Sequence, residues 1–190
     1  MDGFSLAFAL VLSALVPKEE LRFRGAAEQG FDTSCGLSAA ACLMSEYWGL
    51  PASEGELAAA LPRSRLLAGD FRVSLADLKA ALEARGFAAR AYRMDFEELA
   101  AAAERHAPVL VHYDRPEGHF ALVLGVAGGR VVAADPATGT AALGRAAFLR
   151  RYGGLALLAE RRAGERDAEA LEAALALAGG RAELLERVTR

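Results

Sequence analysis

The chain has 190 residues, of which 54% are hydrophobic and 25% charged, and its formal net charge is -3. A chain of this length and composition can bury one well-formed core, which excludes an intrinsically disordered protein. Acidic and basic residues are interspersed, so the sequence lacks the one-sided field that gathers nucleic acid or an anionic membrane. The composition therefore predicts one globular domain with appendages and no nucleic-acid partner.

An uncharged apolar run from Phe4 to Val16 opens the chain. It is too short to span a bilayer comfortably and resembles the apolar region of a signal peptide, although Asp2 stands where a basic residue is usual. The alternative is a buried N-terminal strand or helix. We favour a signal-peptide-like segment over residues 1–16, which predicts a periplasmic or secreted bacterial protein. An uncleaved segment would be its only membrane contact, and without export the protein would be cytoplasmic.

Cys35 is the first of two cysteines and stands where an Ala-rich helix is expected to begin, in QGFDTSCGLSAAACLMSEYWG. The N-terminus of a helix favours a thiolate, because the helix dipole and the unpaired backbone N–H groups stabilise negative charge there. Thr33 or Ser34 is the expected N-cap. Cys42 lies seven residues further along the helix, about 10 Å away, which is beyond disulfide range. Both thiols are therefore expected to be free, and Cys35 is placed as a nucleophile would be.

Reciprocal capping patterns mark the starts of three further helices, at Ser53 with Glu56, Ser74 with Asp77 and Asp95 with Glu98. Apolar residues at a spacing near 3.6 follow each of them, and Gly86 suits the left-handed end of the second helix. These signals predict that the front half of the chain is helical.

From Pro108 the pattern changes to short β-rich runs, namely VLVHY, HFALVLGV, RVVAAD and LALLA. They predict an antiparallel meander, in which HFALVLGV is apolar on both faces and should be a central, covered strand. Helices followed by strands indicate an α+β fold with the N-terminal helices packed on an antiparallel β-sheet. Residues 163–190 are predicted to form a charged helical tail, broken at Gly179 and Gly180.

A cysteine nucleophile needs a base, and histidine is the usual one because it titrates near neutrality. His106 is expected at the C-terminal end of a helix, where an imidazolium complements the helix dipole. His112 lies inside a predicted strand, as either a surface or a satisfied core histidine. His119 opens the predicted central strand directly after Gly118, where its side chain can project into a cleft.

Asp135, in ADPATG at the end of the next strand, is the candidate that orients His119. The alternative is that this aspartate only shapes a turn. A three-residue hairpin loop over residues 127–129 would place the two side chains diagonally on one face, whereas a two-residue Gly-Gly turn would place them on opposite faces. A triad therefore predicts the longer loop.

Chemistry at an acyl group also requires hydrogen-bond donors for the developing oxyanion. The backbone N–H of Cys35 can supply one. The side-chain amide of Gln29, six residues earlier, could supply the second if the chain folds back before the helix. The ordered candidate set is thus Gln29, Cys35, His119 and Asp135.

With this set the sequence resembles the C39 peptidases, a papain-like family that includes the domains cleaving double-glycine leader peptides in bacteriocin exporters. The resemblance rests on QGFDTSCGLSAAACLMSEYWG, SLADLKAALEARGF, GHFALVLGV and ADPATG, and covers roughly residues 21–160. It implies a papain-like thiol protease in which Cys35 attacks, His119 is the base, Asp135 orients it and Gln29 helps to form the oxyanion hole. Ser34 stands where the family usually has Asp.

The resemblance further suggests the stand-alone, exported members found beside bacterial surface-protein or functional-amyloid secretion systems, which would hydrolyse a peptide bond in an exported peptide or protein. The expected organisation is a signal-peptide-like segment (1–16), a peptidase domain (17–162) and the tail (163–190). No cofactor is expected, and no metal, because the spacings typical of metal ligands are absent. Two alternatives remain, an acyltransferase that uses the same acyl-enzyme and a non-catalytic module that holds a peptide in the groove.

Overall fold

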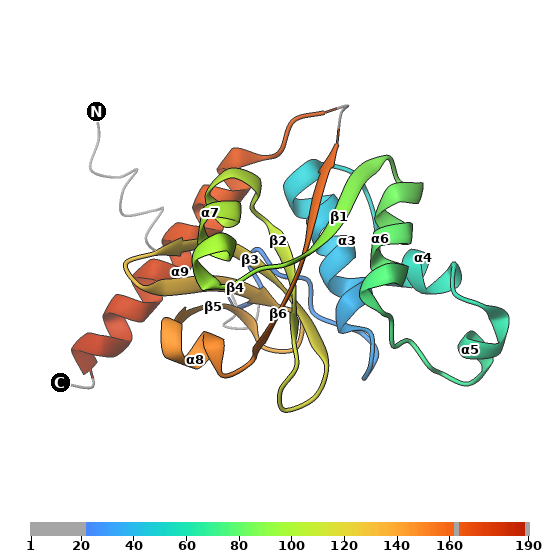
Figure 1. Cartoon of the computed structure of the whole chain (residues 1–190), viewed down its shortest axis with the longest axis horizontal. Coiled ribbons are helices and arrows are strands. Elements are labelled where there is room, and N and C mark those ends of the chain that lie inside the picture. Colours follow the sequence, from blue (N-terminus) through green and yellow to red (C-terminus); the bar gives the residue numbers. More distant parts are fainter. Residues whose placement is uncertain (1–21, 162–163, 189–190) are drawn as a thin grey trace, which may run out of the picture.

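The computed structural model describes residues 22–161 and 164–188, so the signal-peptide-like segment predicted over residues 1–16 lies outside the described residues. Helices and strands follow one another along the chain as drawn in Figure 1: α3 (Cys35–Trp48), α4 (Glu54–Ala59), α5 (Arg63–Leu67), α6 (Leu75–Ala84), β1 (Phe87–Arg93), α7 (Phe96–His106), β2 (Val109–Tyr113), β3 (His119–Ala127), β4 (Arg130–Asp135), β5 (Gly139–Gly144), α8 (Arg145–Leu149), β6 (Tyr152–Arg161) and α9 (Ala168–Val188). Over these two ranges, no helix has the length and apolar character needed to cross a membrane.

The six strands form one antiparallel sheet in the order β1-β6-β2-β3-β4-β5. The predicted α+β class is confirmed, and β2 to β5 follow one another as a meander. The last strand, β6, leaves the meander and lies between β1 and β2. The prediction of a wholly helical front half is wrong, because β1 falls within it; only the first residues of β1 alternate between buried and exposed, so its pattern is weak.

Two apolar clusters cover the two faces of the sheet. One cluster joins α3, α4, α6 and α9 to strand residues such as Leu110, Phe120 and Leu122. The other joins α7 and α8 to the alternate strand residues, among them Val111 and Ala121. The predicted central strand β3 is confirmed, because it contributes buried side chains to both clusters.

The three predicted capping boxes all form, at the starts of α4, α6 and α7. In each, the side chain at the N-cap accepts from the backbone N–H three residues on, and the acidic side chain there accepts in return. Gly86 follows α6 with φ of 85°, the left-handed conformation expected of it. Local sequence thus fixes where these helices begin.

The C-terminal helix α9 is continuous, so the predicted break at Gly179 and Gly180 is wrong. Ala174 and Ala178 on this helix are each only 1% exposed and belong to the same cluster as α3. Two glycines cost a helix roughly 1 kcal/mol each, which the surrounding Ala, Leu and Glu residues and the packing outweigh. The segment predicted as a tail therefore forms part of the core.

Candidate active site

Cys35 is the first residue of α3, as the sequence predicts. Ser34 occupies the N-cap position but makes no side-chain cap, because its hydroxyl donates to the carbonyl of Phe31 at 2.7 Å. No acidic residue lies in the first turn of the helix. The positive end of this helix is therefore neither capped by a side chain nor neutralised by a carboxylate, which favours a thiolate at Cys35.

His119 begins β3, and its Nε2 lies 2.8 Å from Oδ1 of Asp135 at the end of β4. The pair is largely buried, with 18% of the His119 side chain and 5% of the Asp135 side chain exposed. Asp135 also shapes the turn that follows it, since Ala137 N donates to Oδ1 at 2.9 Å and Thr138 N donates to the Asp135 carbonyl at 3.2 Å. Asp135 thus both pairs with His119 and shapes the turn that follows it, as the two interpretations of the sequence predict.

The hairpin between β3 and β4 differs from the predicted one. Ala127 pairs with Arg130, so the turn is the two-residue Gly128-Gly129, and both glycines have the positive φ that such a turn requires. The prediction of a three-residue loop is wrong. The register is corrected further along, where Leu124 forms a β-bulge, so that Leu122 pairs with Ala134.

The bulge at Leu124 determines that His119 and Asp135 lie on the same face of the sheet. Without it, the two-residue turn would place His119 and Asp135 on opposite faces of the sheet, because side chains alternate along a strand. One extra residue in β3 returns Asp135 to the face that His119 occupies, as a diagonal neighbour. The two side chains then lie within hydrogen-bond distance.

Cys35 is hydrogen bonded to the imidazole of His119. With Nε2 held by Asp135, Nδ1 is the ring nitrogen left to face the sulfur. Cys35 comes from the helical layer on one face of the sheet, whereas His119 and Asp135 belong to the opposite face. The three side chains meet where α3 begins beside the start of β3.

The pKa values of Cys35, His119 and Asp135 are each shifted towards the charged form of the side chain. Burial raises the pKa of Cys35, but the hydrogen bond to His119, the backbone N–H groups of Phe120 and Gly36 and the imidazolium charge together lower it below its ordinary value. Burial lowers the pKa of His119, but Asp135 and Cys35 outweigh this and raise it to about 9. Burial likewise acts to raise the pKa of Asp135, whereas its bond to His119 lowers it. The pKa values of all three groups are therefore shifted in the directions that favour a thiolate, an imidazolium and a carboxylate.

Two residues that the sequence did not single out support Asp135 and His119. Arg151 donates from Nη2 to Oδ2 of Asp135 at 3.4 Å, and its guanidinium lies 4.3 Å from the ring centroid of Tyr113. The Tyr113 ring in turn stacks beside His119, with centroids 6.2 Å apart. Tyr113 is paired with His119 across β2 and β3, and Arg151 directly precedes β6, whose first residue, Tyr152, pairs with Tyr113. These long-range contacts have no local signal in the sequence.

Gln29 lies in the loop before α3, where its backbone N–H donates to the Pro136 carbonyl at 3.0 Å. This bond ties the loop to the turn after Asp135. The side-chain Nε2 donates to the carbonyls of Phe31 at 3.1 Å and Asp32 at 3.4 Å. An oxyanion could accept from Nε2 only if one of these loop carbonyls gave up its bond, so the role of Gln29 stays a prediction.

We expect Gln29→Ala to lower turnover by about 10² without unfolding the protein, because an oxyanion donor acts mainly in the transition state. The measurement is kcat and KM on a cleaved peptide, with circular dichroism to confirm the fold. Equal turnover of variant and wild type would show that Gln29 only bonds to its own loop.

Two cavities open on either side of Cys35. One, of about 320 Å³, is bounded by His119, Asp135 and Arg151, and the other, of about 340 Å³, by Gly36, Val73, His112 and Phe120. Four further residues line both cavities, namely Thr33, Arg72, Glu117 and Gly118. A larger cavity, of about 650 Å³, lies between α7, α9 and the far end of β3 and β4, and Cys35 does not line it.

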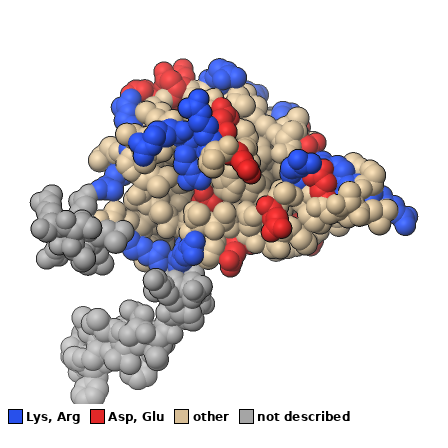
Figure 2. All heavy atoms as spheres, turned by 90° about the horizontal axis from the view of Figure 1, so that it is seen from below, with Lys and Arg blue, Asp and Glu red and all other residues tan. Residues whose placement is uncertain are grey.

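The surroundings of these cavities are of mixed charge. Figure 2 shows acidic and basic side chains next to one another on the face seen from below, and the residues lining the two cavities are likewise of both signs.

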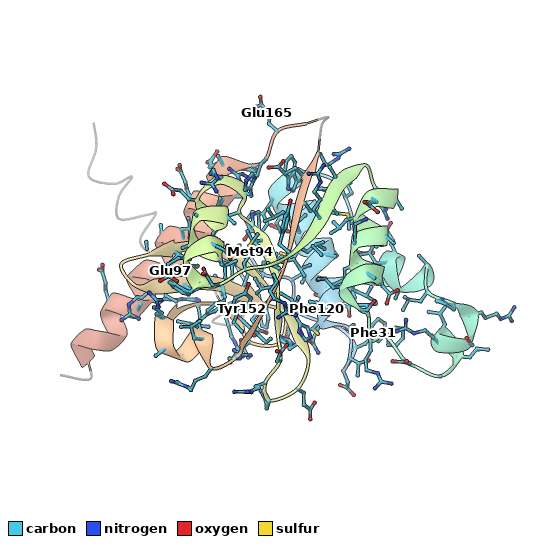
Figure 3. The ribbon with its side chains drawn as sticks, in the orientation of Figure 1. Phe31, Met94, Glu97, Phe120, Tyr152 and Glu165 are labelled. Atoms are coloured by element: carbon cyan, nitrogen blue, oxygen red, sulfur yellow. The ribbon has the colours of Figure 1, made fainter. Side chains whose placement is uncertain are left out.

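Figure 3 shows Phe120 on β3 and Phe31 in the loop before α3 at the lower part of the molecule. Phe31 stacks on Phe71 with centroids 4.2 Å apart, which joins the loop before Cys35 to the loop before α6.

The other two histidines do not contact Asp135, and each pairs with a carboxylate of its own. His106 ends α7, as predicted, and its Nδ1 lies 2.5 Å from Glu160 in a separate cavity. His112 lies on β2 with Nδ1 2.9 Å from Asp114. Both cysteines are free, as predicted. Among residues 22–161 and 164–188, no cluster of three or more His, Cys, Asp or Glu side chains could hold a metal ion.

Comparison with known families gives a match over most of the chain. Residues 25–164 match the Peptidase C39 family. The probable functional amyloid protease FapD of Pseudomonas aeruginosa is 30% identical over an alignment of 152 residues that covers 77% of this chain. The aligned region covers 65% of FapD, so this chain spans about two thirds of that relative's length.

Solved structures share the fold. The peptidase domain of Streptococcus ComA, a bifunctional ABC transporter involved in a quorum-sensing pathway, matches with a TM-score of 0.61 at 17% identity, covering 72% of this chain and 98% of that domain. A double-glycine-motif protease from an AMS/PCAT transporter, solved in complex with its leader peptide, matches with a TM-score of 0.57 at 18% identity, covering 74% and 95%.

Proposed function

Since the chain belongs to the peptidase C39 family of papain-like cysteine peptidases, we propose that it is an endopeptidase with Cys35 as its nucleophile. In this proposal His119 is the acid and base, and Asp135 orients it. The observation that carries the proposal is the chain of hydrogen bonds from Cys35 through His119 to Asp135, placed where two cavities meet.

The proposed reaction follows from the charges of these groups. The Cys35 thiolate attacks the carbonyl carbon of the scissile bond, and the backbone N–H of Cys35, together with Gln29, stabilises the oxyanion. The His119 imidazolium then gives its proton to the departing amine, which leaves an acyl-enzyme. Neutral His119 takes a proton from water as the water attacks the thioester, and the carboxylic acid product departs.

We further propose that the substrate is an exported peptide or protein. Support comes from relatives, since FapD is named as a probable functional amyloid protease and the double-glycine-motif protease was solved with a leader peptide. The test is to incubate the protein with the exported proteins of the same organism and to detect new termini by mass spectrometry. Cleavage by the wild type that is lost in Cys35→Ala would support the proposal, and identical termini with both would contradict it.

The pH dependence of kcat/KM tests the ion pair. We expect activity to fall as the pH rises through about 9, because the raised pKa keeps His119 protonated up to that value and the leaving amine needs its proton. Asp135→Asn removes the carboxylate charge that stabilises the imidazolium, so the alkaline limit should move to lower pH by about one unit. Glu160→Gln, at the carboxylate that pairs with His106, is the matched control and should leave the limit in place. An alkaline limit that does not respond to Asp135→Asn would contradict the assignment.

A further inference from the structure

A second histidine–carboxylate pair faces the cavity on the other side of Cys35. His112 pairs with Phe120 across β2 and β3, so its side chain lies on the face of the sheet that α3 covers. The rings of His112 and Phe120 are in contact, with centroids 4.9 Å apart. Both side chains line the cavity of about 340 Å³ that Cys35 also lines. His112 therefore sits beside the nucleophile without belonging to the triad.

The orientation of the His112 ring is fixed by Asp114. Oδ1 of Asp114 lies 2.9 Å from Nδ1 of His112. Asp114 in turn lies against Gly153, where a Cβ atom would be only 2.0 Å from its Oδ2. Any residue other than glycine at position 153 would therefore displace the carboxylate. The backbone of Asp114 is held as well, since its N–H donates to the Arg151 carbonyl at 2.9 Å.

The remaining ring nitrogen of His112, Nε2, lies next to Gly118. A Cβ atom at Gly118 would lie 3.2 Å from Nε2, and Gly118 lines the same cavity. Because Gly118 has no side chain, position 118 leaves the space beside Nε2 open. Within the described residues, no hydrogen-bond partner of Nε2 is found.

These contacts determine the chemistry of Nε2. A carboxylate at Nδ1 favours the tautomer in which Nδ1 carries the proton, which leaves Nε2 of the neutral imidazole as an acceptor. A peptide that enters the cavity loses water from its main-chain N–H groups, and each buried N–H needs a new acceptor. We propose that His112 accepts a hydrogen bond from a main-chain N–H of the substrate, close to the scissile bond. The proposal rests on the proposed peptidase function and adds a substrate-binding residue to it.

The expected effect is on substrate binding and not on the nucleophile. His112 is not among the groups that bond to Cys35, so the reactivity of the thiol should not depend on it. Loss of one hydrogen bond to the substrate corresponds to roughly tenfold in binding. We therefore expect His112→Ala to raise KM about tenfold, to change kcat less than about twofold, and to leave alkylation of Cys35 by iodoacetamide unchanged.

The decisive experiment combines this variant with a modified peptide. The probe is the peptide that the wild type cleaves fastest in a bacterial proteome-derived library, synthesised with N-methyl groups placed one at a time on the main-chain nitrogens of the three residues on either side of the cut. For the wild type, one N-methyl group should raise KM about tenfold through loss of its hydrogen bond. For His112→Ala the same N-methyl group should not raise KM any further, because the imidazole that accepts the hydrogen bond is already absent.

Three further variants control the result. His112→Gln keeps an acceptor at a similar reach and should recover part of the affinity. Asp114→Asn alters the group that holds the ring and should raise KM in the same direction as His112→Ala. His106→Ala removes a histidine that also pairs with a carboxylate but lines another cavity, and it should leave KM unchanged.

The outcomes separate this inference from the function on which it rests. If each N-methyl group raised KM equally in the wild type and in His112→Ala, at every position, His112 would not accept a hydrogen bond from the substrate. That result would leave the proposed peptidase function intact. Slower alkylation of Cys35 in His112→Ala would also overturn it, since the residue would then act on the thiol. Failure of the wild type to cleave any peptide would contradict the proposed function itself, and the inference would fall with it.

Discussion

His119→Ala is expected to lower kcat/KM by about 10⁴, because the substitution removes the proton donor for the leaving amine, the base for the attacking water and the cation that stabilises the thiolate. His119 and Asp135 act together, so adding Asp135→Ala to His119→Ala should lower kcat/KM little further. The measurement is kcat/KM on a peptide cleaved by the wild type, with thermal unfolding to confirm that the variant is folded.

His106→Ala is the matched control for this experiment. His106 is also hydrogen bonded to a carboxylate, that of Glu160, but it lines a cavity that Cys35 does not. Its loss should change kcat/KM by less than about twofold, as for a substitution remote from the reacting atoms. If His119→Ala retained more than about a tenth of the wild-type activity, His119 could not be the acid and base.

The two cysteines should differ in alkylation rate at pH 6 by at least about 10³. His119 and the start of α3 lower the pKa of Cys35, which is 9% exposed. Cys42 is 1% exposed, and burial together with the charge of Glu46 raises its pKa to about 12, so almost none of it is thiolate at pH 6. Iodoacetamide followed by peptide mapping measures both rates on the same molecule, without any knowledge of the substrate.

The pH dependence of this labelling distinguishes an ion pair from an ordinary thiol. Labelling of Cys35 at pH 6 should be faster than that of an ordinary thiol and should rise less with pH, because the interaction with His119 outweighs burial and lowers the pKa of the thiol. In His119→Ala it should slow at pH 6 and recover as the pH approaches the ordinary thiol value of about 8.5. If Cys35 and Cys42 of the wild type reacted at one slow rate that rose only near pH 8.5, the ordinary thiol value of about 8.5, Cys35 would not be activated. The protein would then be better explained as a peptide-binding module than as a peptidase.

Three of the candidate site residues, Cys35, His119 and Asp135, each have a local signature in the sequence. Cys35 follows a helix N-cap position, His119 opens a strand after a glycine and Asp135 stands in a turn motif. The structure brings these three together, and it places the Gln29 backbone against the turn that follows Asp135. It leaves the Gln29 amide bonded to its own loop, which no local pattern predicts.

The hairpin length predicted from the sequence is wrong because strand register is not a local property. The Gly128-Gly129 turn is the short one, yet His119 and Asp135 lie on one face, since the bulge at Leu124 adds the missing residue within β3. HFALVLGV reads as an uninterrupted apolar run, so nothing in its pattern marks Leu124 as the bulged position. The bulge arises from pairing with β4 and packing between the two layers of helices.

Features whose energy comes from neighbours along the chain can be predicted from the sequence alone. The capping boxes at Ser53, Ser74 and Asp95 each close within three residues, and the start of the helix at Cys35 depends on the same local backbone geometry. Only the tertiary structure decided the place of β6 between β1 and β2, the continuity of α9, and the positions of Arg151 and His112 beside the site. These depend on contacts between segments far apart in the chain, whose energy is gained only when the sheet and both helical layers assemble together.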